Sequence, residues 1–367
     1  MADDDGDVAN EWPPEGHFVI GGAWGLQVST ECLGCTLTSR TASHDLEIGL
    51  PQRDTEPDPI PSEIRWRLGQ PAIPNMELVP PKWACGPVDD REREEERRVS
   101  PVWGTTLGSD TGEVTYPESA RDTALVIRCR FYTTVEASNE AEFEEATKRF
   151  LGELDDWWTR FTAWVGVVTG QDFLGLGGYM RQGTQSGDIR TWTCDGNGQR
   201  AGRGIRSSYP PSRPGIPVSK LQLEDLRGCV TATGKYPPPA EWALIRDARL
   251  LLNAGHIRRA VLDAGAAAEL AMTTLIDQYL DAANAQEPVR LAFAKFNNLG
   301  RKRDLLKVLS PGLLPARVQP DLIEMRNTAS HGGVEITFDQ ALTTVEIATE
   351  IVGAARPLAS LLPPQTA

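Results

Sequence analysis

Three consecutive prolines, Pro237 to Pro239, divide the chain into two parts of different composition, and this break constrains the fold more than any other feature. Proline fixes φ and lacks the backbone N–H, so neither a helix interior nor a central strand continues through such a run. Of the 34 glycines, 27 precede the break and 7 follow it, and all 6 cysteines precede it. We therefore predict two domains, residues 1–236 and residues 237–367, which also suits a chain of 367 residues.

The negative charge belongs almost entirely to the first part. The whole chain has 37 Lys and Arg against 51 Asp and Glu, a net charge of -14, whereas residues 237–367 hold 13 basic and 14 acidic side chains. This leaves residues 1–236 with a net charge of -13 and the second part with -1. Such a balance argues against a general nucleic-acid coat protein and against a binder of anionic membranes, so any phosphate contact must be local.

The N-terminal segment 1–16 is acidic and lacks the basic start and apolar run of a signal peptide. The most apolar segments, 163–168 and 264–276, are far shorter than the ~20 residues that cross a bilayer. Cysteines without regular spacing suit a reducing compartment. We therefore expect a cytoplasmic protein that does not contact a membrane.

The first part is predicted to be an α+β domain of mostly antiparallel strands with one long helix. Short segments rich in β-branched and aromatic residues indicate the strands, at 17–20, 24–29, 35–39, 46–50, 64–68, 76–79 and 124–135. Apolar residues at steps of three and four between 143 and 168 indicate the helix. We expect Asn139, with Glu142 three residues later, to cap its start and Gly170 to end it.

Ligand signals in the first part are weak. Cys32 and Cys35 form a C-x-x-C pair, which fits either half of a zinc site, with Cys85 or His44 to complete it, or a redox pair. Because a second C-x-x-C is absent, we expect ordinary buried cysteines and no metal. The glycine-rich segments 175–179 and 196–204 lack the Lys-Ser/Thr of a phosphate loop and are interpreted as loops.

The second part is predicted to be an all-α bundle of five helices. Its apolar residues follow a helical period throughout, and glycine or proline separates the segments. The expected helices cover about 242–254, 257–282, 301–309, 321–330 and 338–361, the last with a bend at Pro357. Thr337 and Gln340 have the spacing of a capping box for the last helix.

Two polar features interrupt the apolar pattern of this bundle. Glu269 lies on the apolar stripe of the second helix, where a buried carboxylate would need a partner. Arg326, Asn327 and His331 occur in the run RNTASHGG at the end of the fourth helix. Asn327 and His331, four residues apart, share a face, and the long Arg326 side chain can reach over if the helix ends at the following glycines.

An imidazole can transfer a proton near neutral pH, a guanidinium can bind a phosphate bidentately, and an amide can orient either group or a water. Together they suit attack of a ribose 2'-hydroxyl on the neighbouring phosphate, which needs acid–base help and charge stabilisation but no metal. The residue set therefore indicates RNA cleavage without a cofactor. The alternative is a helix-end histidine beside an ion-paired arginine.

The second part resembles a HEPN domain. The resemblance rests on the Arg-polar-x3-His pattern of residues 326–331, followed by Gly332, near the end of the penultimate expected helix. The stretch GHIRRAVLDAGAAAEL, residues 255–270, is similar to the second helix of Apea-like bacterial HEPN proteins, in which a variable N-terminal domain precedes the HEPN domain. The resemblance covers about the last 130 residues of the chain.

The resemblance implies roles for individual residues. His331 would be the general base or acid, Arg326 the cation that binds the phosphate, Asn327 the adjacent polar residue, and Glu269 the acidic partner of Arg326. HEPN sites are shared across a dimer, so a homodimer through the C-terminal helices is expected, with RNA as substrate. The protein would then be a bacterial defence or toxin-like effector, and residues 1–236 would sense an unknown trigger.

One further segment is a candidate for RNA contact. Arg301, Lys302 and Arg303 form a small basic cluster before the third helix. Such a cluster either touches the RNA backbone or is a solvated helix start. The competing hypothesis for the whole protein is a non-catalytic HEPN-like module for dimerisation or for binding RNA or protein, and the acidic net charge favours it.

Overall fold

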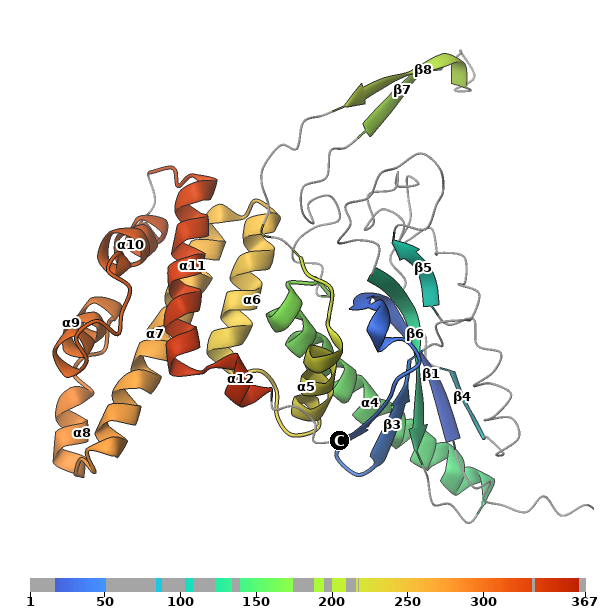
Figure 1. Ribbon diagram of the computed structural model, residues 1–367, viewed down its shortest axis with the longest axis horizontal. Coiled ribbons are helices and arrows are strands. Elements are labelled where there is room, and N and C mark those ends of the chain that lie inside the picture. The colour runs from blue at the N-terminus through green and yellow to red at the C-terminus, as the bar shows by residue number, and fades with distance from the viewer. Residues whose placement is uncertain are drawn as a thin grey trace, which may run out of the picture.

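The structure is a computed structural model of the chain. It describes residues 17–50, 84–87, 103–107, 123–133, 139–173, 188–194, 200–208, 216, 218–331 and 334–362. The expected strands at 64–68 and 76–79 and the glycine-rich segment 175–179 lie outside these residues. Figure 1 shows a region of β-strands beside a region of helices.

An antiparallel sheet forms near the N-terminus. Its strands are β1 (His17–Ser29), β2 (Thr36–Arg40), β3 (Asp45–Gly49), β4 (Ala84–Pro87), β5 (Trp103–Leu107) and β6 (Thr123–Thr133). The order is β2-β3-β6-β1-β4, and β5 also pairs with β6. The two segments expected at 17–20 and 24–29 are one strand, β1, whose register against β6 shifts between Gly22 and Leu26. A bulge explains this shift, because it interrupts pairing without ending the strand.

The long helix α4 (Glu140–Thr169) packs on this sheet. The Asn139 side chain accepts a hydrogen bond from the Glu142 amide at 3.0 Å, and Gly170 ends the helix with a positive φ of 75°, so both expected ends are confirmed. Its buried face is aromatic, and Trp157 meets Phe131 of β6 edge-on with ring centroids 5.8 Å apart. The aromatic residues of α4 therefore belong to a core.

Two elements in the first part differ from the prediction. A second helix, α5 (Leu223–Thr233), packs against α4. A separate two-stranded hairpin joins β7 (Asp188–Cys194) to β8 (Arg200–Ser208), so part of the segment predicted as a loop at 196–204 is a strand. Both elements are short. In α5, Gly228 and the β-branched residues Val230, Thr231 and Thr233 are weak helix formers, so the local sequence does not favour a helix.

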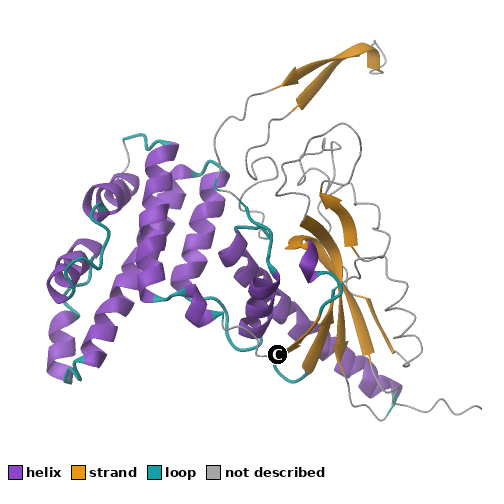
Figure 2. Ribbon diagram, in the orientation of Figure 1, coloured by secondary structure: helices purple, strands orange, loops and turns teal. Residues whose placement is uncertain are grey.

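The C-terminal region is mostly helical (Figure 2). Its longer helices are α6 (Ala240–Asn253), α7 (Ile257–Ala282), α9 (Leu299–Leu309), α10 (Glu324–His331) and α11 (Phe338–Ala355). Two short ones, α8 (Glu287–Phe293) and α12 (Leu358–Leu361), were not predicted separately. The bounds of α7 match the predicted ones. The capping box of Thr337 and Gln340 is confirmed. The helix is interrupted at Pro357, between α11 and α12.

The packing of the two regions continues across the three prolines. Val167 of α4 belongs to the helical core, and Leu358 and Leu361 of α12 contact both cores. Tyr236 receives a hydrogen bond at its carbonyl from Trp164 Nε1 at 3.0 Å and donates one from its hydroxyl to the Leu361 carbonyl at 2.9 Å. The helices α4, α5 and α12 therefore lie where the two regions meet (Figure 1).

Candidate functional site

The end of α10 carries three of the residues selected from the sequence. A turn of π-helix, η3 (Val318–Ile323), leads into α10 and buries Leu322 and Ile323 in the helical core. The Thr344 hydroxyl of α11 donates a hydrogen bond to the Asp321 carbonyl at 2.6 Å, and Arg317 forms an ion pair with the Asp321 carboxylate. These contacts anchor the start of the segment, and buried Ala329 anchors its last turn.

Arg326 lies across α7 at Gly265. A Cβ atom added to Gly265 would lie 2.5 Å from Arg326 Cγ and 3.2 Å from Arg326 Cβ. Carbon atoms in ordinary contact are about 3.5 to 4.0 Å apart, so the stem of Arg326 occupies the space that any other residue would fill at position 265. The arginine is half-buried, and within the described part of the chain its guanidinium has no hydrogen-bond or ion-pair partner.

Asn327 and His331 are both exposed on α10. They are separated by four residues and so lie on one face of the helix. The Ser330 hydroxyl donates a hydrogen bond to the Arg326 carbonyl at 2.9 Å, which closes the last turn of α10 around the site. The imidazole of His331 is therefore presented to solvent at the helix end, one turn beyond Arg326.

The side chain of Arg258, in the first turn of α7, holds the end of α10. Its Nε atom donates to the Ala329 carbonyl, and its Nη2 atom donates to the Ser330 carbonyl at 3.2 Å. The last carbonyls of a helix have no partner within the helix and carry partial negative charge. The Arg258 guanidinium donates hydrogen bonds to two of these carbonyls, and its positive charge offsets their partial negative charge, immediately before His331.

Glu269 pairs with a different cation from the one expected. Its carboxylate forms an ion pair with Lys302 of α9 at 3.3 Å, and no ion pair joins it to Arg326. The Glu269 side chain is 26% exposed, so it lies at the edge of the helical core rather than within it. The carboxylate fixes α9 against α7, and no residue in the described part of the chain forms an ion pair with the Arg326 guanidinium.

The basic cluster at the start of α9 is divided between solvent and internal pairs. Lys302 is 12% exposed and bound to Glu269, while Arg303 is 16% exposed and bound to Asp304 and to the Gln319 side chain. Arg301 is exposed. Exposed Arg301 is thus the member of the cluster that a backbone phosphate could reach without breaking an ion pair.

One stripe of α7 organises the whole arrangement. Arg258, Gly265 and Glu269 are separated by seven and four residues, which places them on the same helix face. They contact, in order, the end of α10, Arg326 and Lys302. Arg258 and Gly265 were not selected from the sequence. The signal that could have found them is their shared stripe with Glu269, within the stretch 255–270.

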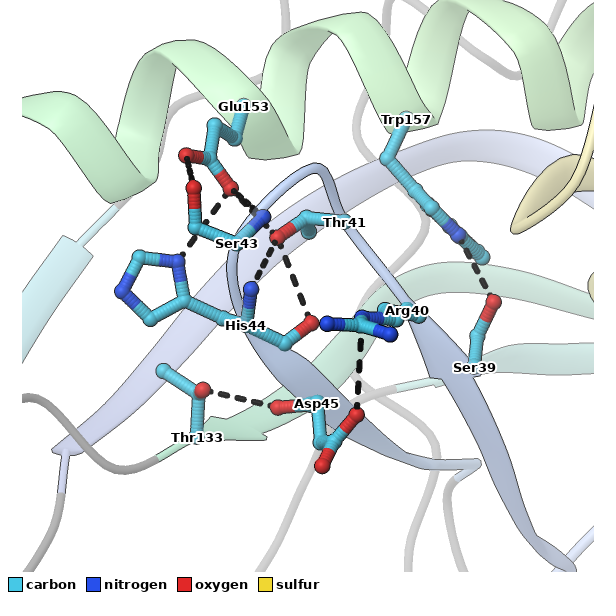
Figure 3. Close-up of polar contacts among 9 residues, drawn as sticks. All are labelled: Ser39, Arg40, Thr41, Ser43, His44, Asp45, Thr133, Glu153 and Trp157. Atoms are coloured by element: carbon cyan, nitrogen blue, oxygen red, sulfur yellow. Dashed lines mark hydrogen bonds and ion pairs between the residues drawn. The ribbon is translucent and has the colours of Figure 1, made fainter.

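A second polar cluster joins the β2–β3 turn to α4 (Figure 3). The Glu153 carboxylate accepts hydrogen bonds from the Thr41 hydroxyl at 2.5 Å, from the Ser43 hydroxyl at 2.7 Å and amide at 3.0 Å, and contacts His44 Nδ1 at 3.2 Å. Burial opposes ionisation of this carboxyl, but the hydrogen bonds outweigh it and lower the pKa of Glu153 to about 2.

This cluster holds the β2–β3 turn against α4 and is not a catalytic triad. In a triad the histidine lies between the carboxylate and the hydroxyl nucleophile. Here Ser43 and His44 both bind the carboxylate of Glu153, so no base is directed at the hydroxyl. His44 also packs edge-on against Phe150, with ring centroids 5.2 Å apart. The arrangement explains how the turn is held on α4.

The C-x-x-C pair is protonated at neutral pH. Burial raises the pKa of Cys32 to about 12 and that of Cys35 to about 11, and the Cys32 thiol donates to the Leu221 carbonyl at 3.6 Å. Zinc binds thiolates, so this environment disfavours it. Within the residues that the structure describes, no three His, Cys, Asp or Glu side chains gather as a metal site requires, and His44 is bound to Glu153.

Comparison of the chain with protein-family models, with curated proteins and with solved structures finds no match. In the described portion of the chain, no helix combines the length and the apolar character that a membrane span requires.

Proposed function

We propose that the protein is a metal-independent endoribonuclease of the HEPN type, with its site at the end of α10. The observation that carries the proposal is the combination of a half-buried Arg326 guanidinium, which has no partner among the described residues, and an exposed His331 imidazole five residues later. A guanidinium that no carboxylate occupies can bind a phosphate. An exposed imidazole can reach the hydroxyl of a bound ribose.

The proposed reaction is attack of a ribose 2'-hydroxyl on its own phosphate. His331 accepts the proton of the 2'-hydroxyl, or protonates the departing 5'-oxygen, and Arg326 stabilises the charge that develops on the phosphate. Asn327 orients the phosphate or a water from the same helix face. The products are a 2',3'-cyclic phosphate and a free 5'-hydroxyl.

A single imidazole supplies one acid–base group, whereas this cleavage uses both an acid and a base. We propose that two chains pair through their C-terminal helices, so that residues 321–331 of each face the other. Exposure of both Asn327 and His331 is compatible with such pairing. Residues 1–236 would then sense an unknown trigger in the cytoplasm, and the protein would act as a defence or toxin-like effector.

The test is cleavage of total RNA by the full chain in EDTA. Wild type should give fragments with cyclic phosphate ends, and His331→Ala and Arg326→Ala should give none. His256→Ala is the matched control, because His256 is the other exposed histidine of the helical region and lies before α7. Equal cleavage by wild type and His331→Ala would refute the assignment.

A non-catalytic binding module is the second candidate. It is favoured by the internal pairing of Lys302 and Arg303, which removes two cations from any RNA surface. Under this alternative His331→Ala would leave RNA or partner binding unchanged, and no cyclic phosphate would form. A measurement of binding by fluorescence anisotropy, beside the cleavage assay, separates the two functions.

A further inference from the structure

The interaction between Arg258 and α10 goes beyond the residues already assigned. Arg258 donates to the carbonyls of Ala329 and Ser330, the two residues that precede His331. Among the described residues, no other side chain bonds to these two carbonyls. The two glycines that follow His331 in the sequence carry no side chain for this purpose. Arg258 is therefore the side-chain cap that the described residues provide for this helix end.

Two separate points then fix the short helix α10 on α7. Arg326 packs on Gly265, while the carbonyls at 329 and 330 bind Arg258, which lies seven residues before Gly265. The order of contacts is reversed along the two helices, so α7 and α10 run in opposite directions. Because α10 has only 8 residues, these two contacts determine the orientation of its whole last turn.

We propose that Arg258 is a positioning residue for the reaction at His331. The inference rests on the proposed ribonuclease function. Arg258 does not touch the phosphate in this proposal, because its guanidinium is already engaged with two carbonyls. It holds the last turn of α10 closed, and so keeps the His331 imidazole at a fixed place relative to Arg326.

The expected consequence is a loss in kcat without a loss in RNA binding. A displacement of about 1 Å at a catalytic group can lower a rate by about 100-fold. We expect Arg258→Gln to lower kcat by about 10-fold to 100-fold and to change KM less than about twofold. Arg258→Lys should restore part of the rate, because an ammonium can still donate to one of the carbonyls.

Arg259→Gln is the matched control. Arg259 is adjacent to Arg258, exposed and of the same charge. Its positive charge acts on Asp263: burial raises the pKa of that carboxyl, and Arg259 lowers it. Any general effect of removing one positive charge from the start of α7 should appear equally in both variants. A specific effect should appear only in Arg258→Gln.

Hydrogen exchange supplies a readout that does not depend on activity. In the full chain, amides of residues 327–331 should exchange several-fold faster in Arg258→Gln than in wild type or Arg259→Gln, because an uncapped helix end frays. Unchanged exchange would overturn the inference, whatever the enzyme does. Faster exchange in a chain whose wild type cleaves no RNA would refute the proposed function and leave the structural role standing.

The kinetic measurements complete the test. Faster exchange together with a lower kcat and an unchanged KM supports the positioning role. A raised KM with unchanged kcat would instead mean that Arg258 binds RNA directly, which would overturn the proposal. Full activity in Arg258→Gln would overturn it as well.

Discussion

Replacement of Gly265 by alanine should reverse the usual effect of this substitution in a helix. Alanine in place of glycine in a helix interior stabilises a protein by about 1 kcal/mol, because glycine loses more backbone freedom on folding. Gly265 lies in the middle of the 26-residue helix α7, so propensity alone predicts stabilisation. The contact with Arg326 predicts the opposite.

The size of the effect follows from the packing. The added Cβ would lie 2.5 Å from Arg326 Cγ, about 1 Å inside ordinary carbon contact. Arg326 Cβ would itself lie 3.2 Å away, so a change of rotamer that moves Cγ relieves only part of the overlap and α10 must also shift. Overpacking of this kind costs about 1 to 3 kcal/mol. The propensity gain is the same in both variants, so we expect Gly265→Ala to be less stable than Gly353→Ala by about 1 to 3 kcal/mol.

Gly353 is the internal reference, because it lies within α11 and an added Cβ there would have no neighbour within 4 Å. Urea unfolding followed by circular dichroism measures both variants. Arg326→Ala removes the Cγ atom, so combining it with Gly265→Ala should recover most of the penalty, a coupling of about 1 to 2 kcal/mol. If Gly265→Ala stabilised the protein as much as Gly353→Ala does, the described crossing of Arg326 over α7 would be refuted.

Three further predictions concern other parts of the molecule. The lowered pKa of Glu153, about 2 against an ordinary 4.5, means that its carboxylate stabilises the fold above pH 4.5 and that this contribution disappears as the pH falls toward 2. Glu153→Gln should therefore unfold about 2 kcal/mol more easily than wild type in urea at pH 7, with the gap closing in acid; a constant gap would contradict this. Thr337→Ala removes the capping box of α11 and should cost about 1 kcal/mol in the same assay, whereas Thr343→Ala, within the helix, should cost less. The thiol of Cys35, with a pKa raised to about 11, should react about 100-fold more slowly with iodoacetamide at pH 8 than free cysteine, as peptide mapping would show; alkylation at the rate of the free amino acid would contradict the burial.

The parts of the fold that were predicted are those with a long period or explicit caps. The 26 residues of α7 repeat their apolar pattern over several turns, and Asn139 and Thr337 mark helix starts by side chains that bond the third residue of the helix. The helix α5 was missed because Gly228, Val230, Thr231 and Thr233 are weak helix formers, and α8 was missed because its 7 residues cover only about two turns.

The structure places Arg326, Asn327 and His331 together on α10, as their spacing predicted, but the predicted pairing of Glu269 with Arg326 was wrong. Sequence spacing placed Asn327 and His331 on one face, since that depends only on helical geometry. The partner of Glu269 depends on how α9 packs against α7, and there Lys302 lies closer than Arg326. The role of Arg258 depends likewise on where α10 ends in space. Tertiary contacts of this kind have no signal in a single sequence.

The helix α12 has a consequence for how the chain can be divided. Its residues Leu358 and Leu361 are shared between the two cores, and Tyr236 binds the Leu361 carbonyl. A fragment cut at the three prolines would keep α12 but lose Tyr236 and Val167, and would expose apolar surface to water. The change of composition at the three prolines and the packing contact between the two regions therefore lie at different places in the chain. A pulling force applied to α12 would act on both regions at once.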